Sequence, residues 1–160
     1  MDLNGVPPSE YGEKYQEHFL ALFKDFVKSA DAISARRYTA NQVFLTLNST
    51  VIGLVGYLRL GATEAAASSL VYSAAAVVGM AFCYTWYHLI QSFKTLNGAK
   101  FDVINEMEKS LPVKTYTAEW QALQTRNYQP FSSLERYVPA AFFVVHLGVF
   151  LLGIWQTLST

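Results

Sequence analysis

Three stretches of the sequence, residues 38–58, 70–91 and 137–158, contain no Asp, Glu, Lys or Arg. A helix needs about 20 residues to cross the hydrocarbon core of a bilayer, so each stretch is long enough for one span. Only 15% of the chain is charged, against about 25% in a typical soluble domain, and 52% is hydrophobic. The sequence therefore predicts an all-α integral membrane protein with three transmembrane helices.

The basic residues are distributed unevenly around these stretches. Of the 12 Lys and Arg residues, only Arg59 lies between the first and second stretches, and none follows the third. Because Lys and Arg are enriched in cytoplasmic loops, this asymmetry predicts a cytoplasmic N-terminus and an external C-terminus. The N-terminal sequence has no basic start followed by an apolar run, so we do not expect a cleaved signal peptide. The expected location is the bacterial inner membrane.

Two amphipathic segments extend the first two spans on the cytoplasmic side. After an irregular leader (1–8), residues 9–37 carry apolar side chains at alternating steps of four and three, with the small Ser29 as an interruption. Residues 92–111 continue the second span with the same rhythm and one mismatch, Lys100. We therefore expect the two segments to pack against each other as an antiparallel cytoplasmic helical hairpin. Its expected packing residues, within the stalk or between copies, are Phe19, Leu22, Phe26, Ile33, Phe93, Leu96, Ile104 and Met107.

The remaining boundaries follow from turn and cap signals. We expect transmembrane helices at 38–60 and 70–91, joined by an external loop at 61–69. Residues 112–132 form a connector with one short helix that Thr117 caps. The third transmembrane helix covers 133–158: Ser132 and Glu135 fit a capping box at its start, and Pro139 tilts it.

The first span has an unusual polar side. On a helical wheel, its amide and hydroxyl side chains fall within one arc of about half the circumference. These residues are Asn41, Gln42, Thr46, Asn48, Ser49 and Thr50. Lipid cannot solvate such groups, so they need partners. They bond to other helices within the bundle or between subunits, or they line a pore. Both interpretations remain open from the sequence.

Other candidate residues suggest contacts with lipid rather than chemistry. The expected interface or headgroup anchors are Arg36, Arg37, Trp86, Tyr87 and Trp155. His88 and His146 have no second ligand at metal-binding spacing, which favours hydrogen bonding, with pH sensing as the alternative. The single cysteine, Cys83, is interpreted as core packing. We expect no enzyme activity, cofactor or metal, and the zero net charge gives no indication of nucleic-acid binding.

Three sequence motifs resemble a known family. They are Ala32-x-Ser34-Ala-Arg-Arg-x-Thr39-Ala-Asn41, Trp86-Tyr87-x-Leu-Ile90-x-Ser92-Phe and Asn97-x-Ala-Lys100-Phe-x-Val-Ile104-x-Glu106-Met-Glu-Lys. The chain resembles the RipA-type family of small octameric bacterial inner-membrane proteins. More distantly, it is similar to the SLATT group of membrane effectors, proposed pore-formers that usually have two spans. The resemblance implies a homo-oligomer, possibly an octamer, and no established chemistry.

Two functional hypotheses follow from these observations. In the first, copies of the chain form a ring-shaped assembly with a channel or pore role, in which the polar side of the first span borders the axis. In the second, the assembly is a non-conducting membrane scaffold or regulatory protein that recruits partners through its cytoplasmic helices. The partners expected in either case are other copies of the chain and membrane lipids.

Overall fold

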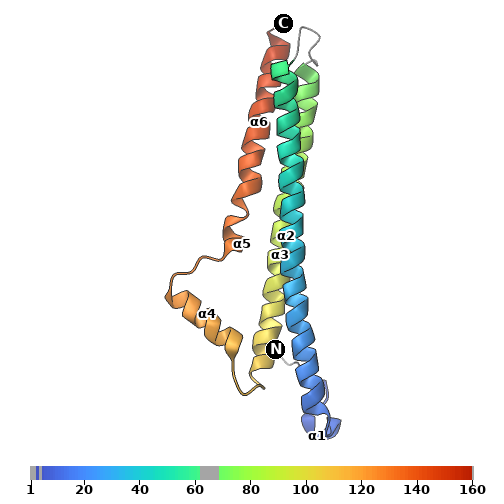
Figure 1. Ribbon diagram of the computed structural model, residues 1–160, viewed down its shortest axis with the longest axis vertical. Coiled ribbons are helices and arrows are strands. Elements are labelled where there is room, and N and C mark those ends of the chain that lie inside the picture. The colour runs from blue at the N-terminus through green and yellow to red at the C-terminus, as the bar shows by residue number, and fades with distance from the viewer. Residues whose placement is uncertain (1–2, 4, 62–68, 160) are drawn as a thin grey trace. The chain divides into compact units, whose positions relative to one another are not determined.

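The computed structural model describes residues 3, 5–61 and 69–159, with the backbone alone at residues 60, 61, 131 and 132. These ranges contain six helices and no strand, which confirms the all-α prediction (Figure 1). The helices are α1 (Pro8–Tyr11), α2 (Tyr15–Gly61), α3 (Ser69–Glu108), α4 (Thr115–Thr125), α5 (Phe131–Leu134) and α6 (Tyr137–Leu158).

The chain divides into two units, and the long helices α2 and α3 run through both. Unit 1 consists of residues 1–36 and 93–130, and unit 2 consists of residues 37–92 and 131–160. Helix α2 has 47 residues and α3 has 40, without a break in either. The charge-free stretches 38–58 and 70–91 are therefore each continuous in one helix with an adjoining segment of unit 1.

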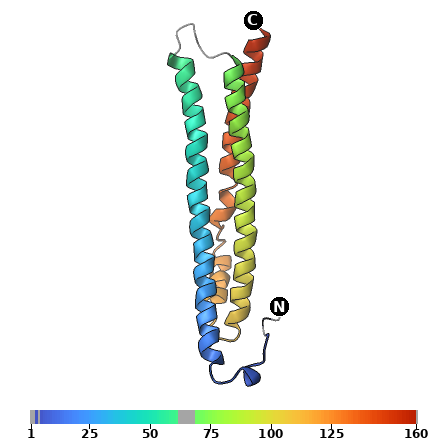
Figure 2. The same cartoon turned by 90° about the vertical axis from the view of Figure 1, so that its right-hand side faces the viewer.

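Unit 2 is a bundle of three helical segments, from α2, α3 and α6, which lie side by side (Figure 2). Within the described residues, α3 and α6 are long and apolar enough to cross a membrane, whereas α2 does not meet the same criterion. The spans within α3 and α6 are therefore supported directly, whereas the predicted first span, which lies within α2, remains a prediction.

A seven-residue repeat organises the core of unit 2. The buried residues of α6 are Pro139, His146 and Gly153, each seven positions after the last. On α2 the buried Asn48 and Val55 have the same spacing. The buried side of α3 follows steps of four and three through Tyr72, Ala76, Gly79, Cys83, Trp86 and Ile90. This periodicity is typical of helices that cross at about 20° and pack side chains into one another's gaps.

Unit 1 pairs the N-terminal half of α2 with the C-terminal half of α3. Ile33, Ile104 and Met107 of the expected stripe are buried, and Ala30, at 2% exposure, is buried beside Ser29. The Lys100 mismatch is accommodated by a cation–π contact, in which its Nζ lies 4.2 Å from the centre of the Phe26 ring.

Other predicted stalk residues have mixed surroundings within unit 1. Phe19, Phe26 and Phe93 are half-buried. Leu22 and Leu96 are 63% and 47% exposed, and a contact between copies stays a prediction for both. Leu22 lines an apolar cleft of about 440 Å³ together with Tyr15, Phe19 and Val103.

The N-terminal boundary differs from the prediction. A helix starting at Ser9 and running without a break was expected, but α1 ends at Tyr11 and α2 begins only at Tyr15. Gly12 separates them with φ of +89°, a conformation that residues with a Cβ rarely adopt. The leader predicted to be irregular through residue 8 also ends earlier, because Pro8 is already the first residue of α1.

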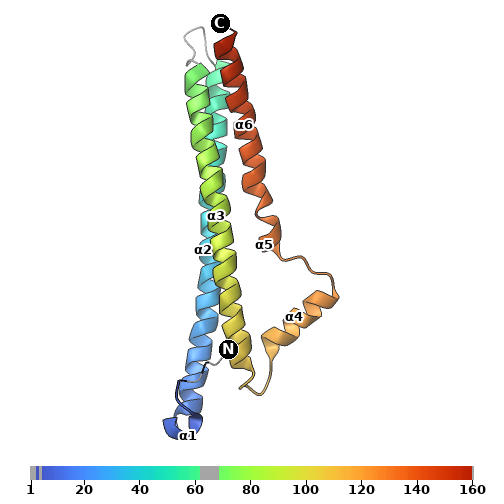
Figure 3. The same cartoon turned by 180° about the vertical axis from the view of Figure 1, so that it is seen from behind.

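The later boundaries also shift. Helix α3 ends at Glu108, three residues before its expected end, and hydrogen-bonded turns follow up to Leu111. The third span does not start at 133, because α5 ends at Leu134 and a separate helix, α6, begins at Tyr137 (Figure 3). Pro139 is the third residue of α6, within the first turn, where a missing N–H breaks no helical hydrogen bond. Most of the predicted 61–69 loop, residues 62–68, lies outside the described residues.

Candidate functional site

A buried polar cluster joins the three helices of unit 2 at the level of Asn48. The Asn48 Oδ1 accepts a hydrogen bond from the Cys83 Sγ of α3 at 3.1 Å and lies 3.0 Å from the His146 Nε2 of α6. The Asn48 Nδ2 donates to the carbonyl oxygen of Phe44, one turn earlier, at 2.8 Å. All three cluster side chains are at most 1% exposed. One amide therefore links α2, α3 and α6.

Glycines create the space that this arrangement needs. A Cβ on Gly79 would lie 2.1 Å from the His146 Cε1, so the imidazole ring rests directly on the backbone of α3. Seven residues further along α6, a Cβ on Gly153 would lie 2.4 Å from the Ser73 Oγ. Small residues let membrane helices approach closely, and here they fix where α6 touches α3.

A second polar contact lies one heptad before Asn48 on α2. The Trp86 Nε1 donates to the Asn41 Oδ1 at 2.8 Å. The indole is 2% exposed and packs between the rings of Phe44, at 6.0 Å between centroids, and Phe142, at 6.2 Å. The prediction of Trp86 as an interface anchor is wrong within this chain, because its side chain belongs to the core of the bundle.

The polar arc predicted for the first span is divided between two surroundings. Asn41 and Asn48 bond within the bundle, whereas the other four members are exposed: Gln42, Thr46, Ser49 and Thr50. Thr46 and Asn48 are two residues apart, which corresponds to about 200° around the helix. The arc is so wide that its Asn48 edge is buried in the bundle while its Thr46 edge is exposed. In the described contacts, the Gln42 amide donates to the Tyr38 hydroxyl.

The predicted interface residues also have different roles. Arg37 is 19% exposed and its Nε lies 3.6 Å from the Glu135 Oε2, so its charge pairs within unit 2. Glu135 was expected to complete a capping box with Ser132, and the Ser132 side chain lies outside the described residues. Arg36 is exposed, as are Tyr87 at 40% and Trp155 at 71%. These three remain available for lipid contacts.

Two further contacts join the last turns of α6 to the end of α2 and to the start of α3. The Arg59 guanidinium donates to the Gln156 Oε1 at 2.9 Å, and the hydroxyls of Ser69 and Thr157 are 2.7 Å apart. The α2 segment between Arg37 and Arg59 is therefore bonded to Gln156 of α6 at one end and paired at the other with Glu135, which lies two residues before α6 begins.

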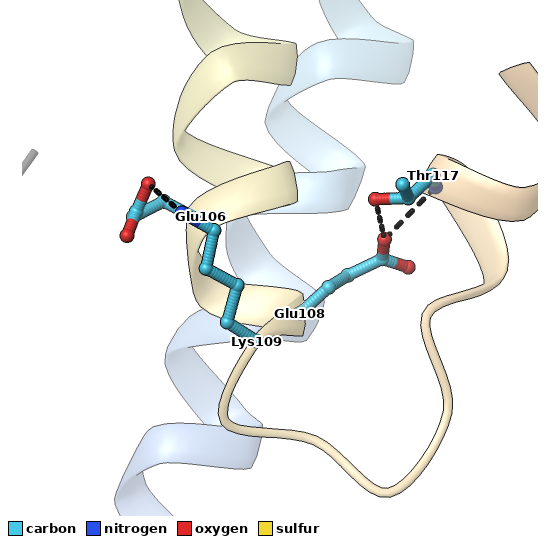
Figure 4. A network of polar contacts seen from close by, with 4 residues as sticks. All are labelled: Glu106, Glu108, Lys109 and Thr117. Carbon is cyan, nitrogen blue, oxygen red and sulfur yellow. Dashed lines mark hydrogen bonds and ion pairs between the residues drawn. The ribbon is translucent and has the colours of Figure 1, made fainter. Parts of the chain in front are cut away.

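Glu108 is a buried carboxylate in unit 1 that sequence analysis did not single out. It accepts hydrogen bonds from the Thr117 backbone N–H at 3.0 Å and the Thr117 hydroxyl (Figure 4). It also accepts from the backbone N–H of Tyr116 at 2.7 Å and from the Thr115 hydroxyl. It caps α4 from outside that helix. The prediction that Thr117 is the cap is wrong, because α4 already begins at Thr115 and Thr117 donates to Glu108 instead. Glu106 lies on the other side of α3 and bonds Lys109 at 2.8 Å.

This cap makes the corner between α3 and α4 sensitive to acid. Burial alone would raise the pKa of Glu108, but the hydrogen bonds from Tyr116, Thr117 and Thr115 outweigh it and hold the pKa below its ordinary value of 4.5. Because the pKa of Glu108 is lowered in the folded state, the stability that its ionised carboxylate contributes is fully present above pH 4.5. This stability is lost as the pH falls through the folded-state pKa.

We predict that the Glu108→Gln variant destabilises this corner by about 2 kcal/mol, because the charged acceptor of four hydrogen bonds is lost. The protection of the amides of Tyr116 and Thr117 against hydrogen exchange should fall at pH 7. In the wild-type protein it should fall only below pH 4.5. The matched control is Glu106→Gln, which removes an exposed contact and should leave both amides protected. Equal protection in the two variants would contradict the capping role.

Among the described residues there is no group of three or more His, Cys, Asp or Glu side chains that could hold a metal ion. His88 is exposed, and its ring contacts those of Tyr84 and Tyr87 on the same helix. The described contacts of the polar cluster are those of a structural tie between helices, and the exposed polar residues of α2 are the part of the predicted site that needs a partner.

Comparison with known proteins gives one match. The model of the octameric membrane protein family (8xMP) matches residues 20–155, which include α3, α4, α5 and most of α2 and α6. Neither the curated proteins nor the solved structures gave a match. The resemblance to the octameric family is thereby confirmed, whereas the distant similarity to the SLATT group stays a prediction. The match extends over most of the chain, and the chain belongs to the octameric membrane protein family.

Proposed function

We propose that eight copies of the chain form a ring in the bacterial inner membrane and that the exposed polar side of α2 borders a pore along the axis. The family to which the chain belongs supports self-association as an octamer. The observation that carries the pore proposal is the division of the polar arc. Four hydrogen-bonding side chains of α2 remain outside the bundle after Asn41 and Asn48 have found partners within it.

This proposal requires that α2 cross the membrane in addition to α3 and α6. Helix α6 has 22 residues and is apolar enough to cross a membrane. Helix α2 is paired through Arg37 with Glu135, two residues before α6 begins, and is bonded through Arg59 to Gln156 near the end of α6, so residues 38–58 lie alongside α6. A segment that accompanies a membrane helix over its whole length lies at the same depth. The absence of charged residues from 38 to 58 agrees with that position.

The exposed surfaces of α2 and α6 differ in chemistry. Helix α6 exposes large apolar side chains, among them Val144 at 67%, Leu151 at 57% and Leu158 at 81%. Lipid solvates these side chains, but it cannot satisfy the hydroxyl and amide groups of Thr46, Ser49 and Gln42. This contrast supports an arrangement in which α6 faces lipid and the Thr46 side of α2 faces the axis or a neighbouring copy. A path lined by uncharged hydroxyls and amides would admit water and small solutes without strong selection by charge.

Pore formation is tested by solute flux and by the accessibility of the α2 face. In vesicles, the purified protein should release K⁺ or a small uncharged solute, and Thr46→Leu should reduce the flux about tenfold or more. Val144→Leu, on the apolar side of α6, is the matched control and should leave it unchanged. In a Cys83→Ser background, a charged thiol reagent should modify Thr46→Cys at least tenfold faster than Leu54→Cys, although Leu54 is also exposed. A wild-type protein that releases neither solute would exclude the pore.

A non-conducting scaffold is the second candidate. It is favoured by the apolar cleft of unit 1 and by the exposed Leu22 and Trp120, the latter at 47%, which offer contact surfaces for another protein. We propose that unit 1 is cytoplasmic, as the distribution of Lys and Arg indicates. If no solute leaks while Thr46→Cys is also inaccessible to water-soluble reagents, the polar side of α2 bonds only to neighbouring copies and the scaffold explains the observations better.

A further inference from the structure

The ring of His146 lies at the point where α6 contacts both other helices of unit 2. Its Nε2 is 3.0 Å from the Asn48 Oδ1, which also accepts from the Cys83 Sγ. A carbonyl oxygen can accept two hydrogen bonds, so the contacts are satisfied when the imidazole is neutral and carries its hydrogen on Nε2. In this state the cluster has a donor for each lone pair of the Asn48 oxygen.

The second ring nitrogen, Nδ1, belongs to the part of the ring that lies against Gly79 of α3. A Cβ on Gly79 would lie 2.3 Å from the His146 Nδ1. In the described contacts, Nδ1 has no acceptor beside it and needs none while it carries no hydrogen. The fit of the ring against Gly79 therefore suits the neutral form of the imidazole.

The helices packed against His146 offer no counter-charge. No Asp, Glu, Lys or Arg occurs between Arg37 and Arg59 on α2, from Ser69 to Phe93 on α3, or within α6. At the cluster, α2 presents the Asn48 amide and α3 presents the Cys83 thiol, which is the one titratable group in contact with the network. The neighbouring histidine, His88, is exposed and contacts Tyr84 and Tyr87.

A protonated imidazole would not fit this arrangement. An imidazolium donates from both nitrogens, so Nδ1 would also need an acceptor, and the described contacts provide none beside it. A buried charge without a partner is also strongly unfavourable inside a membrane bundle. We propose that His146 is a proton-operated latch. Its neutral ring holds α6 against α2 and α3, and proton uptake requires that α6 separate from Gly79 and that water or lipid headgroups reach the ring.

Cys83 provides a direct readout because it is the only cysteine of the chain and bonds the same Asn48 oxygen. The wild-type protein in vesicles is treated with N-ethylmaleimide between pH 8 and pH 5, and alkylation is measured at each pH. The rate is divided by the rate for the same protein denatured in SDS at that pH. This ratio removes the intrinsic effect of pH on the thiol and reports the opening of the helix contact alone.

The ratio should be constant above about pH 6.5, the ordinary pKa of histidine in water, and should rise as the pH falls, by up to tenfold per pH unit. The sign follows because the closed form excludes the proton, so its stability is complete above the pKa of the open form and is lost in acid. In His146→Gln, which keeps an N–H donor for Asn48 and does not titrate, the ratio should not change with pH. The matched control, His88→Gln, should behave as the wild type does.

A wild-type ratio that stays constant down to pH 5 would overturn the proposal, and this result does not depend on any variant folding. A rise that persists in His146→Gln, or one that disappears in His88→Gln, would also overturn it, because the responsible group would then be another one. The measurement does not involve solute flux, so its outcome is separate from that of the pore proposal.

Discussion

The Gly79→Ala variant is expected to lose about 3 kcal/mol of folding stability, although only one methyl group is added. The new Cβ would lie between 2.1 and 2.4 Å from three atoms of the His146 ring. The ring cannot stay in place at these distances, and its displacement breaks the contact with Asn48. Overpacking a core typically costs about 1–3 kcal/mol, and the lost hydrogen bond adds about 1 kcal/mol. Unfolding in SDS, followed by circular dichroism, measures the effect.

The matched control is Gly148→Ala on α6, two residues after His146. A Cβ on Gly148 has no atom within 4 Å, so the change should be within about 1 kcal/mol and in the stabilising direction, since alanine favours helix. Removing the ring should also relieve the clash, so His146→Ala should cost much less in the Gly79→Ala background than in the wild type. Equal losses in both backgrounds would mean that the two residues do not meet.

The helical architecture could be predicted because it depends on periodicity along a single chain. Charge-free stretches mark apolar helices, and the alternating steps of three and four mark the buried side of α3 as far as Ile104 and Met107. Periodicity fails where two neighbouring residues compete for one position. Steps of three and four allow either residue 29 or residue 30 to belong to the apolar stripe, and the structure buries Ala30.

The composition of the candidate site could be predicted, but its division could not. The wheel places Asn48 and Thr46 in one polar arc. Which edge of that arc is buried depends on Cys83 and His146, which are 35 and 98 positions away along the chain. Gly79 carries no chemical signal at all, since its importance lies in the ring that rests on it. Tertiary partners of this kind are not encoded in any local pattern.

Capping by Glu108 illustrates the same limit outside the bundle. The local sequence indicates Thr117 as a cap. The actual cap is Glu108 at the end of the preceding helix, which accepts hydrogen bonds from the Thr115 hydroxyl and from the N–H groups of Tyr116 and Thr117. Trp86 was interpreted as interfacial from its residue type, and the amide of Asn41 on another helix explains its burial. In both cases a residue was interpreted from its neighbours in sequence and its role was determined by a second helix.

The pair of adjacent arginines, Arg36 and Arg37, should respond very differently to the same substitution. We expect Arg37→Gln to destabilise unit 2 by about 3 kcal/mol, because it leaves the Glu135 carboxylate, 9% exposed, without the charge 3.6 Å away. The Glu135 Oε2 is buried and has no hydrogen bond in the described contacts, so Arg37 is the compensation that the structure provides for this oxygen. Arg36→Gln, at an exposed side chain, should change the stability by less than about 0.5 kcal/mol.

A charge exchange separates this ion pair from a lipid anchor. If Arg37 acts through Glu135, the double variant Arg37→Glu with Glu135→Arg should recover at least half of the stability that each single reversal loses. A headgroup anchor would instead make Arg37→Glu equally harmful in both backgrounds, and both arginines would contribute alike in anionic vesicles. The ion pair joins α2 to Glu135, two residues before α6 begins. Its loss should therefore also raise the reactivity of Cys83 at pH 8, because α6 would be held only at its middle and far end.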